Sequence, residues 1–156
     1  MIKRIYIDTS VFGGYFDQEF EKETKPFFDK IIQEKIKIIV SEVLELEIYR
    51  APDFIQDFFE SIPDTLIETV ELTDEIRDLA NRYINEKVVG KTSTADCQHI
   101  AIATVYKADV LVSWNFKHIV NLERIRGYNS INFREGYQMI EIRTPKEIFN
   151  YEDTKD

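Results

Sequence analysis

Short apolar runs alternate with amphipathic segments along this chain, and that alternation limits the folds open to it. Apolar runs typical of β-strands occupy about residues 3–7, 36–40, 66–72, 109–113 and 139–142. Strands that alternate with helices usually form a mostly parallel sheet covered by helices on both faces. The sequence therefore predicts an α/β fold, a three-layer sandwich around a mostly parallel central sheet.

Apolar residues at helical spacing predict the helices between these strands. They cover about residues 25–34, 42–50, 73–87 and 94–107, with a short aromatic helix that begins at Pro52 and one or two short helices after residue 115. Pro26 is expected in the first turn of its helix. Gly13 and Gly14 predict a flexible or tightly packed turn after the first strand. We expect a single domain over residues 1–156, with a peripheral tail after about residue 145.

Composition places the chain among globular proteins. Its 156 residues suffice for one sizeable core, and 44% hydrophobic with 31% charged residues is typical of a soluble domain. No uninterrupted apolar stretch reaches the length of a membrane span. The single cysteine, Cys97, fits a reducing, cytoplasmic setting and is expected to be a buried apolar side chain. The net charge of −9 argues against bulk attraction to nucleic acid, but a nuclease stays open because a carboxylate-rich metal site is itself negative.

An acidic residue follows the first predicted strand directly, since Asp8 comes after the run 4–7. In open α/β sheets, ligand sites form in the crevice outside the carboxyl ends of the strands. A carboxylate buried there is costly unless a cation neutralises it, which makes Asp8 a candidate metal ligand. The hydroxyl groups of Ser10 and Ser113, near two strand ends, are candidates to support such ligands by hydrogen bonding.

Three glutamates lie on the helix that follows the second strand, and helical geometry separates them. Steps of ~100° per residue place Glu47 within the apolar arc of this helix, whereas Glu42 and Glu45 point away from it. A carboxylate that faces the core needs a neutralising partner. Glu47 is therefore the preferred site residue, and the other two are expected to be solvated.

Two more polar residues lie where they could join Asp8. Asp96 shares its side of a mostly apolar helix with apolar residues, although an acid in the first helical turn also stabilises the helix dipole. Asn115 follows the strand 109–113, where its amide oxygen could ligate a metal or hydrogen-bond a water. An ordinary turn residue is an equally natural role for Asn115.

Other chemistries find little support in the sequence. His99 and His118 have no partners at metal-ligand spacing, and we place His99 toward the polar side of its helix, so both are expected to be structural. Gly13 and Gly14 lack the lysine and hydroxyl residue of a phosphate-binding loop. No Gly-x-Ser-x-Gly sequence is present.

The order and spacing of these residues resemble the PIN-domain family, small α/β metal-dependent ribonucleases that include toxins of the VapC type. The matching segments are Ile5–Ser10, Ser41 with Glu47 six positions on, Asp96 followed by Ile100–Ala103, and Asp109–Asn115. They span residues 2 to about 120, most of the chain. Each motif alone is weak, but four in the same order make a fairly specific resemblance.

The resemblance implies a metal pocket of Asp8, Glu47, Asp96 and a fourth acid, which Asn115 replaces here. It implies Mg²⁺ or Mn²⁺ as the cofactor and RNA as the substrate. The leading hypothesis is thus a metal-dependent endoribonuclease, the toxin of a toxin–antitoxin pair. Asp8 and Asp96 would ligate the metal, and Glu47 would ligate it or orient the attacking water. Asn115 would hold a metal-bound water or complete the coordination shell. Because an amide carries no charge, a second metal should bind less readily.

Two alternatives stay open. The chain could be a catalytically degenerate PIN-like module that binds RNA or a protein partner. The aromatic helix with Phe54, Phe58 and Phe59 could form a homodimer or antitoxin interface, although such a helix more often packs on its own core.

Lys91 and Lys117 could contact the RNA backbone or be ordinary surface charges.

Overall fold

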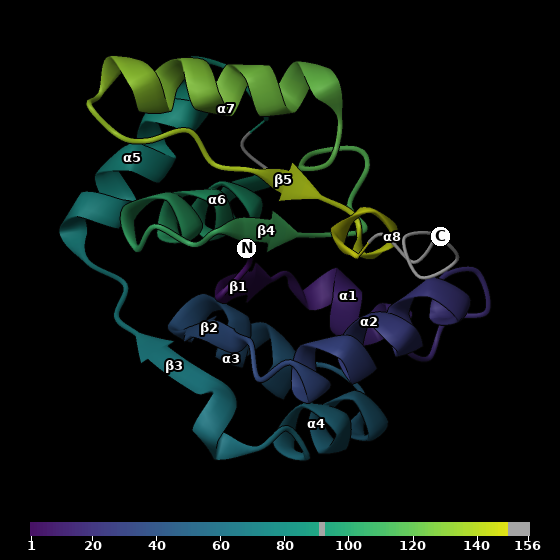
Figure 1. Cartoon of the computed structure of the whole chain (residues 1–156). Helices are drawn as coiled ribbons and strands as arrows, with labels where there is room; N and C mark the ends of the chain where they lie inside the picture. Colours follow the sequence, from purple (N-terminus) through teal and green to yellow (C-terminus); the bar gives the residue numbers. More distant parts are fainter. Residues whose placement is uncertain (91–92, 150–156) are drawn as a thin grey trace.

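The centre of the fold is a parallel sheet. A computed structural model describes residues 1–90 and 93–149. Figure 1 shows five strands in the order β3-β2-β1-β4-β5, and each runs parallel to its neighbours. They are β1 (Arg4–Ile7), β2 (Lys37–Ser41), β3 (Ile67–Val70), β4 (Val110–Val112) and β5 (Ile142–Arg143). The predicted α/β class and parallel sheet are confirmed.

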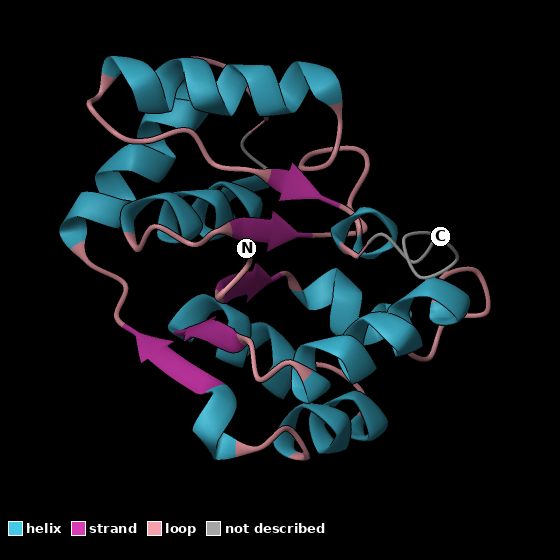
Figure 2. Cartoon of the chain, viewed as in Figure 1, coloured by secondary structure: helices cyan, strands magenta, loops and turns pink. Residues whose placement is uncertain are grey.

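Helices surround the sheet (Figure 2). Those in the described part of the chain are α1 (Thr9–Gly14), α2 (Glu21–Gln33), α3 (Glu42–Tyr49), α4 (Asp53–Glu60), α5 (Asp74–Asn85), α6 (Thr94–Val105), α7 (Leu122–Arg134) and α8 (Pro145–Ile148). No helix within residues 1–90 and 93–149 is both long and apolar enough to cross a membrane.

Successive strand residues contribute to two separate cores, because side chains of a strand alternate between its faces. On β1, Tyr6 packs with residues of α5, α6 and α7, whereas Ile5 and Ile7 pack with residues of α1, α2 and α3. All three side chains are fully buried. Burial of each such side chain is worth about 1.5–3 kcal/mol. The two cores, one on each face of the sheet, confirm the three-layer arrangement.

Helix α1 replaces the turn that we expected around Gly13 and Gly14. A Cβ atom at Gly14 would lie 2.8 Å from Cδ1 and Nε1 of Trp114, so only glycine lets the indole pack this closely. The expectation of tight packing is confirmed at Gly14, but the prediction of a turn is wrong. The residue that requires this glycine, Trp114, lies far along the chain, so the local sequence does not reveal the contact.

Three other boundaries differ from the prediction. Helix α2 begins at Glu21, so Pro26 lies inside it and not in its first turn. Pro26 is exposed, and the hydrogen bond that it cannot donate is therefore lost on the solvent side of the helix. Strand β5 starts at Ile142, later than the predicted residue 139. Part of the expected peripheral tail forms α8, which packs against α2 with Ile148 on the core.

The aromatic helix α4 turns two of its three phenylalanines inward. Phe58 and Phe59 pack against Phe12, with ring centroids 6.3 and 5.4 Å apart, as expected for a helix that covers its own core. Phe54 is 52% exposed and contacts Phe16. Only the outer edge of this helix is therefore available as an apolar surface.

The topology of the sheet places a switch point at β1. The chain adds β2 and β3 on one side of β1 and β4 and β5 on the other. Sites in open α/β sheets lie outside the carboxyl ends of the strands at such a point. Asp8 directly follows β1, and Ser113 directly follows β4.

Candidate metal centre

Asp8 is anchored between β1 and β4. Its backbone N–H donates to the carbonyl of Val112 at 2.9 Å, which continues the pairing of the two strands. Its carboxylate is only 4% exposed, and Oδ2 accepts hydrogen bonds of 2.8 Å from both Ser10 Oγ and Ser113 Oγ. Both hydroxyl groups that we named as supports thus contact the same oxygen. Oδ1 lies 3.6 Å from His99 Nε2, toward the middle of the site.

Glu47 faces inward from α3, as the helical periodicity predicts. Glu42 and Glu45 are exposed, whereas Glu47 is half-buried and its Oε1 accepts from Thr9 Oγ1 at 2.6 Å. The same oxygen lies 2.6 Å from His99 Nε2. Burial alone would raise the pKa of Glu47, but the hydrogen bonds and charge of its partners outweigh it and hold the pKa below its usual value.

His99 is the site residue that sequence reasoning missed. We expected it on the polar side of its helix without partners, but it is fully buried, and each ring nitrogen has a partner. Nδ1 lies 2.5 Å from Tyr6 Oη, and Nε2 lies between the carboxylates of Glu47 and Asp8. Desolvation lowers the pKa of His99, but the hydrogen bond to Glu47 and the charge of Asp8 outweigh it, so the pKa is raised.

The missed signal was the spacing of His99 from Asp96. Residues three apart in a helix lie on neighbouring positions of the same face. Since Asp96 was assigned to the site side of α6, His99 belonged there too. The apolar residues around the rest of α6 concealed this face, because a helix that is buried nearly all round has no clear polar side.

Asp96 and Asn115 meet at the edge of the cluster. Asn115 Nδ2 donates to Asp96 Oδ2 at 3.2 Å, while Asn115 Oδ1 accepts from the backbone N–H of His118 at 3.0 Å. The amide nitrogen, which cannot ligate a cation, therefore faces Asp96. Burial, and next the charge of Asp8, raise the pKa of Asp96 to about 6. Lys117 is exposed beside Asn115, and Lys91 lies outside the described residues.

The inner residues of this cluster fit a divalent cation. One donor atom from each of Asp8, Glu47 and His99 can be chosen so that all three lie within 4.8 Å of one another. Carboxylate oxygens and imidazole nitrogen together suit divalent metal ions. Asp96 does not belong to this closest group, but its charge acts on the same site.

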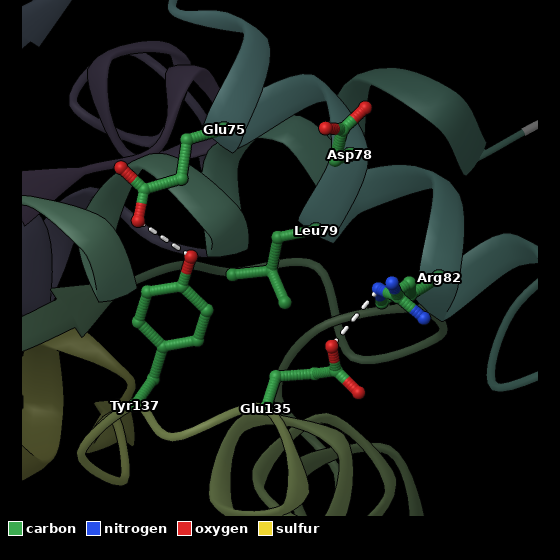
Figure 3. A pocket seen from close by; sticks show the side chains of 6 residues that line it. All are labelled: Glu75, Asp78, Leu79, Arg82, Glu135 and Tyr137. Carbon is green, nitrogen blue, oxygen red and sulfur yellow. Dashed lines mark hydrogen bonds and ion pairs between the residues drawn. The ribbon is translucent and has the colours of Figure 1, made fainter.

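A pocket elsewhere in the molecule offers no comparable centre. Figure 3 shows its lining residues, which come from α5 and the segment after α7. Its glutamates already have partners, since Glu75 accepts from Tyr137 Oη at 2.6 Å and Glu135 pairs with Arg82 at 3.0 Å. None of the residues that line this pocket belongs to the segments that carry the candidate metal ligands.

Several solved structures of low sequence identity share this fold. No curated protein sequence gives a significant match. Among solved structures, VapBC2 from Rickettsia felis bound to promoter DNA is 12% identical with a TM-score of 0.54, over 90% of this chain and 98% of that chain. VapC20 from Mycobacterium tuberculosis, a Sarcin-Ricin loop cleaving toxin, is 12% identical with a TM-score of 0.54, over 72% and 91%. FitAcB from Neisseria gonorrhoeae is 11% identical with a TM-score of 0.58, over 92% and 99%.

At these identities the structural likenesses establish the fold. The sequence model of the PIN domain family independently matches residues 5–118, which begin in β1 and end just beyond Asn115. The matched range includes the four residues assigned to the site from sequence. This chain belongs to the PIN domain family.

Proposed function

We propose that this protein is an endoribonuclease that uses Mg²⁺ or Mn²⁺ to hydrolyse RNA phosphodiester bonds, as the toxin of a toxin–antitoxin pair. One observation carries the proposal: Asp8 and Glu47, from different segments, lie close together at the topological switch point of a PIN-domain sheet. The likeness to VapC20, described as a Sarcin-Ricin loop cleaving toxin, supports a cleavage function.

The residues of the cluster would have different roles in this reaction. Asp8, Glu47 and Asp96 would hold the cation, and Ser10 and Ser113 fix the Asp8 carboxylate through Oδ2. A divalent cation supplies Lewis acidity, which lowers the pKa of a water and neutralises charge on the phosphodiester. Glu47 is held on Oε1 and would ligate the cation or orient the attacking water.

Asn115 has a role in this scheme even if its amide does not ligate the metal. Its hydrogen bond to Asp96 Oδ2 orients that carboxylate, and its own orientation is fixed by the backbone of His118. To serve as an oxygen ligand, the amide would have to turn over and lose both hydrogen bonds. Asn115 therefore acts first as a positioning residue for Asp96 in our proposal.

The proposed partners are an RNA substrate, a protein antitoxin and a second copy of the chain. The similarity of the fold to VapC20, which is described as a toxin, supports the choice of a protein antitoxin, and the exposed edge of α4 around Phe54 is the candidate surface. We place the protein in the cytoplasm, because its single cysteine is a buried free thiol.

Cleavage of an end-labelled RNA pool tests the function. We expect cutting with Mn²⁺ or Mg²⁺, none with EDTA, and a large loss in Asp96→Asn. Glu45→Gln is the control for loss of one carboxylate charge, because Glu45 lies on the exposed side of α3, away from the site. Cutting that survives both EDTA and Asp96→Asn would contradict the proposal.

A catalytically degenerate module is the second candidate, and the orientation of Asn115 favours it. A site with one acid fewer, whose replacement turns a nitrogen toward Asp96, holds cations less strongly. RNA binding without cutting, across a wide range of metal concentrations, would support this alternative.

A further inference from the structure

We infer that His99 is itself a ligand of the metal ion and that the site therefore selects a transition-metal cation such as Mn²⁺ over Mg²⁺. The inference rests on the proposed metal-dependent function and names the cation that the site takes. It starts from the position of one atom: Nε2 of His99 lies 2.6 Å from Glu47 Oε1 and 3.6 Å from Asp8 Oδ1.

These separations are close to what a shared cation requires. Ligands bonded at about 2.1 Å and at right angles to one another lie about 3 Å apart. The contact with Glu47 is slightly shorter than this value and the contact with Asp8 slightly longer. Both contacts of His99 thus lie within an ångström of the spacing that a shared ion requires, and donor atoms of all three residues lie within 4.8 Å of one another.

The other nitrogen of His99 is held as in many metal-bound histidines. Such residues almost always hydrogen-bond through their second ring nitrogen, which fixes the ring and the tautomer. Here Nδ1 contacts Tyr6 Oη at 2.5 Å, and Tyr6 Oη contacts Ser41 Oγ at 2.8 Å. Ser41 is held in turn by the backbone N–H of Leu44, at the start of the helix that carries Glu47. In the metal-bound form the proton would stay on Nδ1, facing Tyr6, and Nε2 would give up the proton that it shares with Glu47 in the metal-free site.

His99 also offers the additional metal-ligand atom that Asn115 does not offer. Asp96 and His99 are three residues apart on α6, so this helix can offer one oxygen and one nitrogen to the same site. Imidazole is a borderline ligand that suits transition metals, whereas Mg²⁺ prefers oxygen ligands and retains water. A cluster of carboxylates with one buried imidazole therefore favours Mn²⁺ over Mg²⁺.

The test detects nitrogen bound to the metal. Metal-free protein is titrated with Mn²⁺, free Mn²⁺ is measured by electron paramagnetic resonance, and the complex is examined by pulsed methods for ¹⁴N coupling. The chain has only two histidines, so labelling histidine with ¹⁵N assigns the coupling to imidazole, and His118→Gln serves as the matched control for His99→Gln. Competition with Mg²⁺ measures the preference.

We expect histidine nitrogen coupling in the wild type and in His118→Gln, and its loss in His99→Gln. The preference for Mn²⁺ over Mg²⁺ should fall by about tenfold or more in His99→Gln. Bound Mn²⁺ without nitrogen coupling in the wild type would overturn the inference, and RNA cleavage by that complex would leave the proposed nuclease intact. Failure of the wild type to bind Mn²⁺ at all would overturn the inference, and failure to bind Mg²⁺ as well would overturn the proposed metal-dependent function. The wild-type spectrum decides the question even if His99→Gln does not fold.

Discussion

Replacement of Gly14 by alanine should destabilise the protein, whereas Gly13→Ala beside it should not. A Cβ at Gly14 would lie 2.8 Å from two atoms of the Trp114 indole and 3.1 Å from Thr24 Oγ1. The indole cannot retreat freely, because its Nε1 donates to Thr24 Oγ1 at 2.9 Å and Phe20 stacks on it with ring centroids 4.4 Å apart.

Three contributions set the size of the effect. Overpacking of a filled core costs about 1–3 kcal/mol, and loss of the Trp114–Thr24 hydrogen bond costs about 0.5–1.5 kcal/mol. Alanine recovers at most about 1 kcal/mol over glycine in a helix. With the full helix gain subtracted, the free energy of unfolding should therefore fall by about 0.5–3.5 kcal/mol in Gly14→Ala. At Gly13 the new Cβ meets only Ile55 Cδ1 at 3.9 Å, so the gain in helix propensity stands alone.

Urea unfolding followed by fluorescence measures both variants. Trp114 is the only tryptophan, so the signal reports the site of the clash directly. Trp114 also connects the clash to the metal centre, because its backbone N–H donates to Ser10 Oγ and Ser10 holds Asp8. Gly14→Ala should thus weaken Mn²⁺ binding as well. Equal changes in stability for the two variants would refute the packing argument.

Three other changes test the site. Glu47→Gln should lower RNA cleavage by about 100-fold, whereas Glu45→Gln should change it little; equal losses would contradict the inward orientation of Glu47. Tyr6→Phe leaves buried His99 Nδ1 without its partner and should lower the free energy of unfolding, measured in urea, by about 1–3 kcal/mol. Because burial raises the pKa of Asp96 to about 6 from 3.8, the folded protein binds a proton in this window that the unfolded chain has released. Metal-free protein should therefore lose stability as pH rises through the window, and Asp96→Asn should lose less; identical pH profiles with EDTA present would exclude this linkage.

Local patterns predicted the residues whose environment depends on their own element. Asp8 follows a buried strand, and Glu47 shares an arc of its helix with apolar neighbours. Strand order and helical periodicity therefore sufficed to predict that both side chains face the site. The same reasoning failed at His99, since α6 is buried nearly all round and periodicity cannot rank its faces. The spacing of His99 from Asp96 was the local indication of its position, and its partners Tyr6 and Glu47 come from distant segments.

The helix α1 was missed for a related reason. Glycine pairs usually indicate turns, because glycine lowers helix propensity. Position 14 needs a glycine because the indole of Trp114 occupies the space where a side chain would be, so this glycine marks a close contact and not a turn. The orientation of Asn115 was equally hidden, since the backbone of His118 and the carboxylate of Asp96 determine it together. The contact with His118 is local, but the contact with Asp96 joins two different elements and is not encoded in either of them alone.

We expect Asn115 to limit the number of cations that the proposed metal site can hold. Asp8, Glu47 and Asp96 supply enough negative charge for one divalent cation, whereas a second would leave an excess of positive charge in a partly buried site, which is costly. Asn115→Asp should therefore raise the Mn²⁺ stoichiometry measured by calorimetry. Without metal, the same change replaces a hydrogen bond of 3.2 Å to Asp96 with two facing carboxylates, so the variant should unfold more easily in EDTA and gain more stability from Mn²⁺ than the wild type. Unchanged stoichiometry together with unchanged stability in EDTA would show that Asn115 does not limit the metal site.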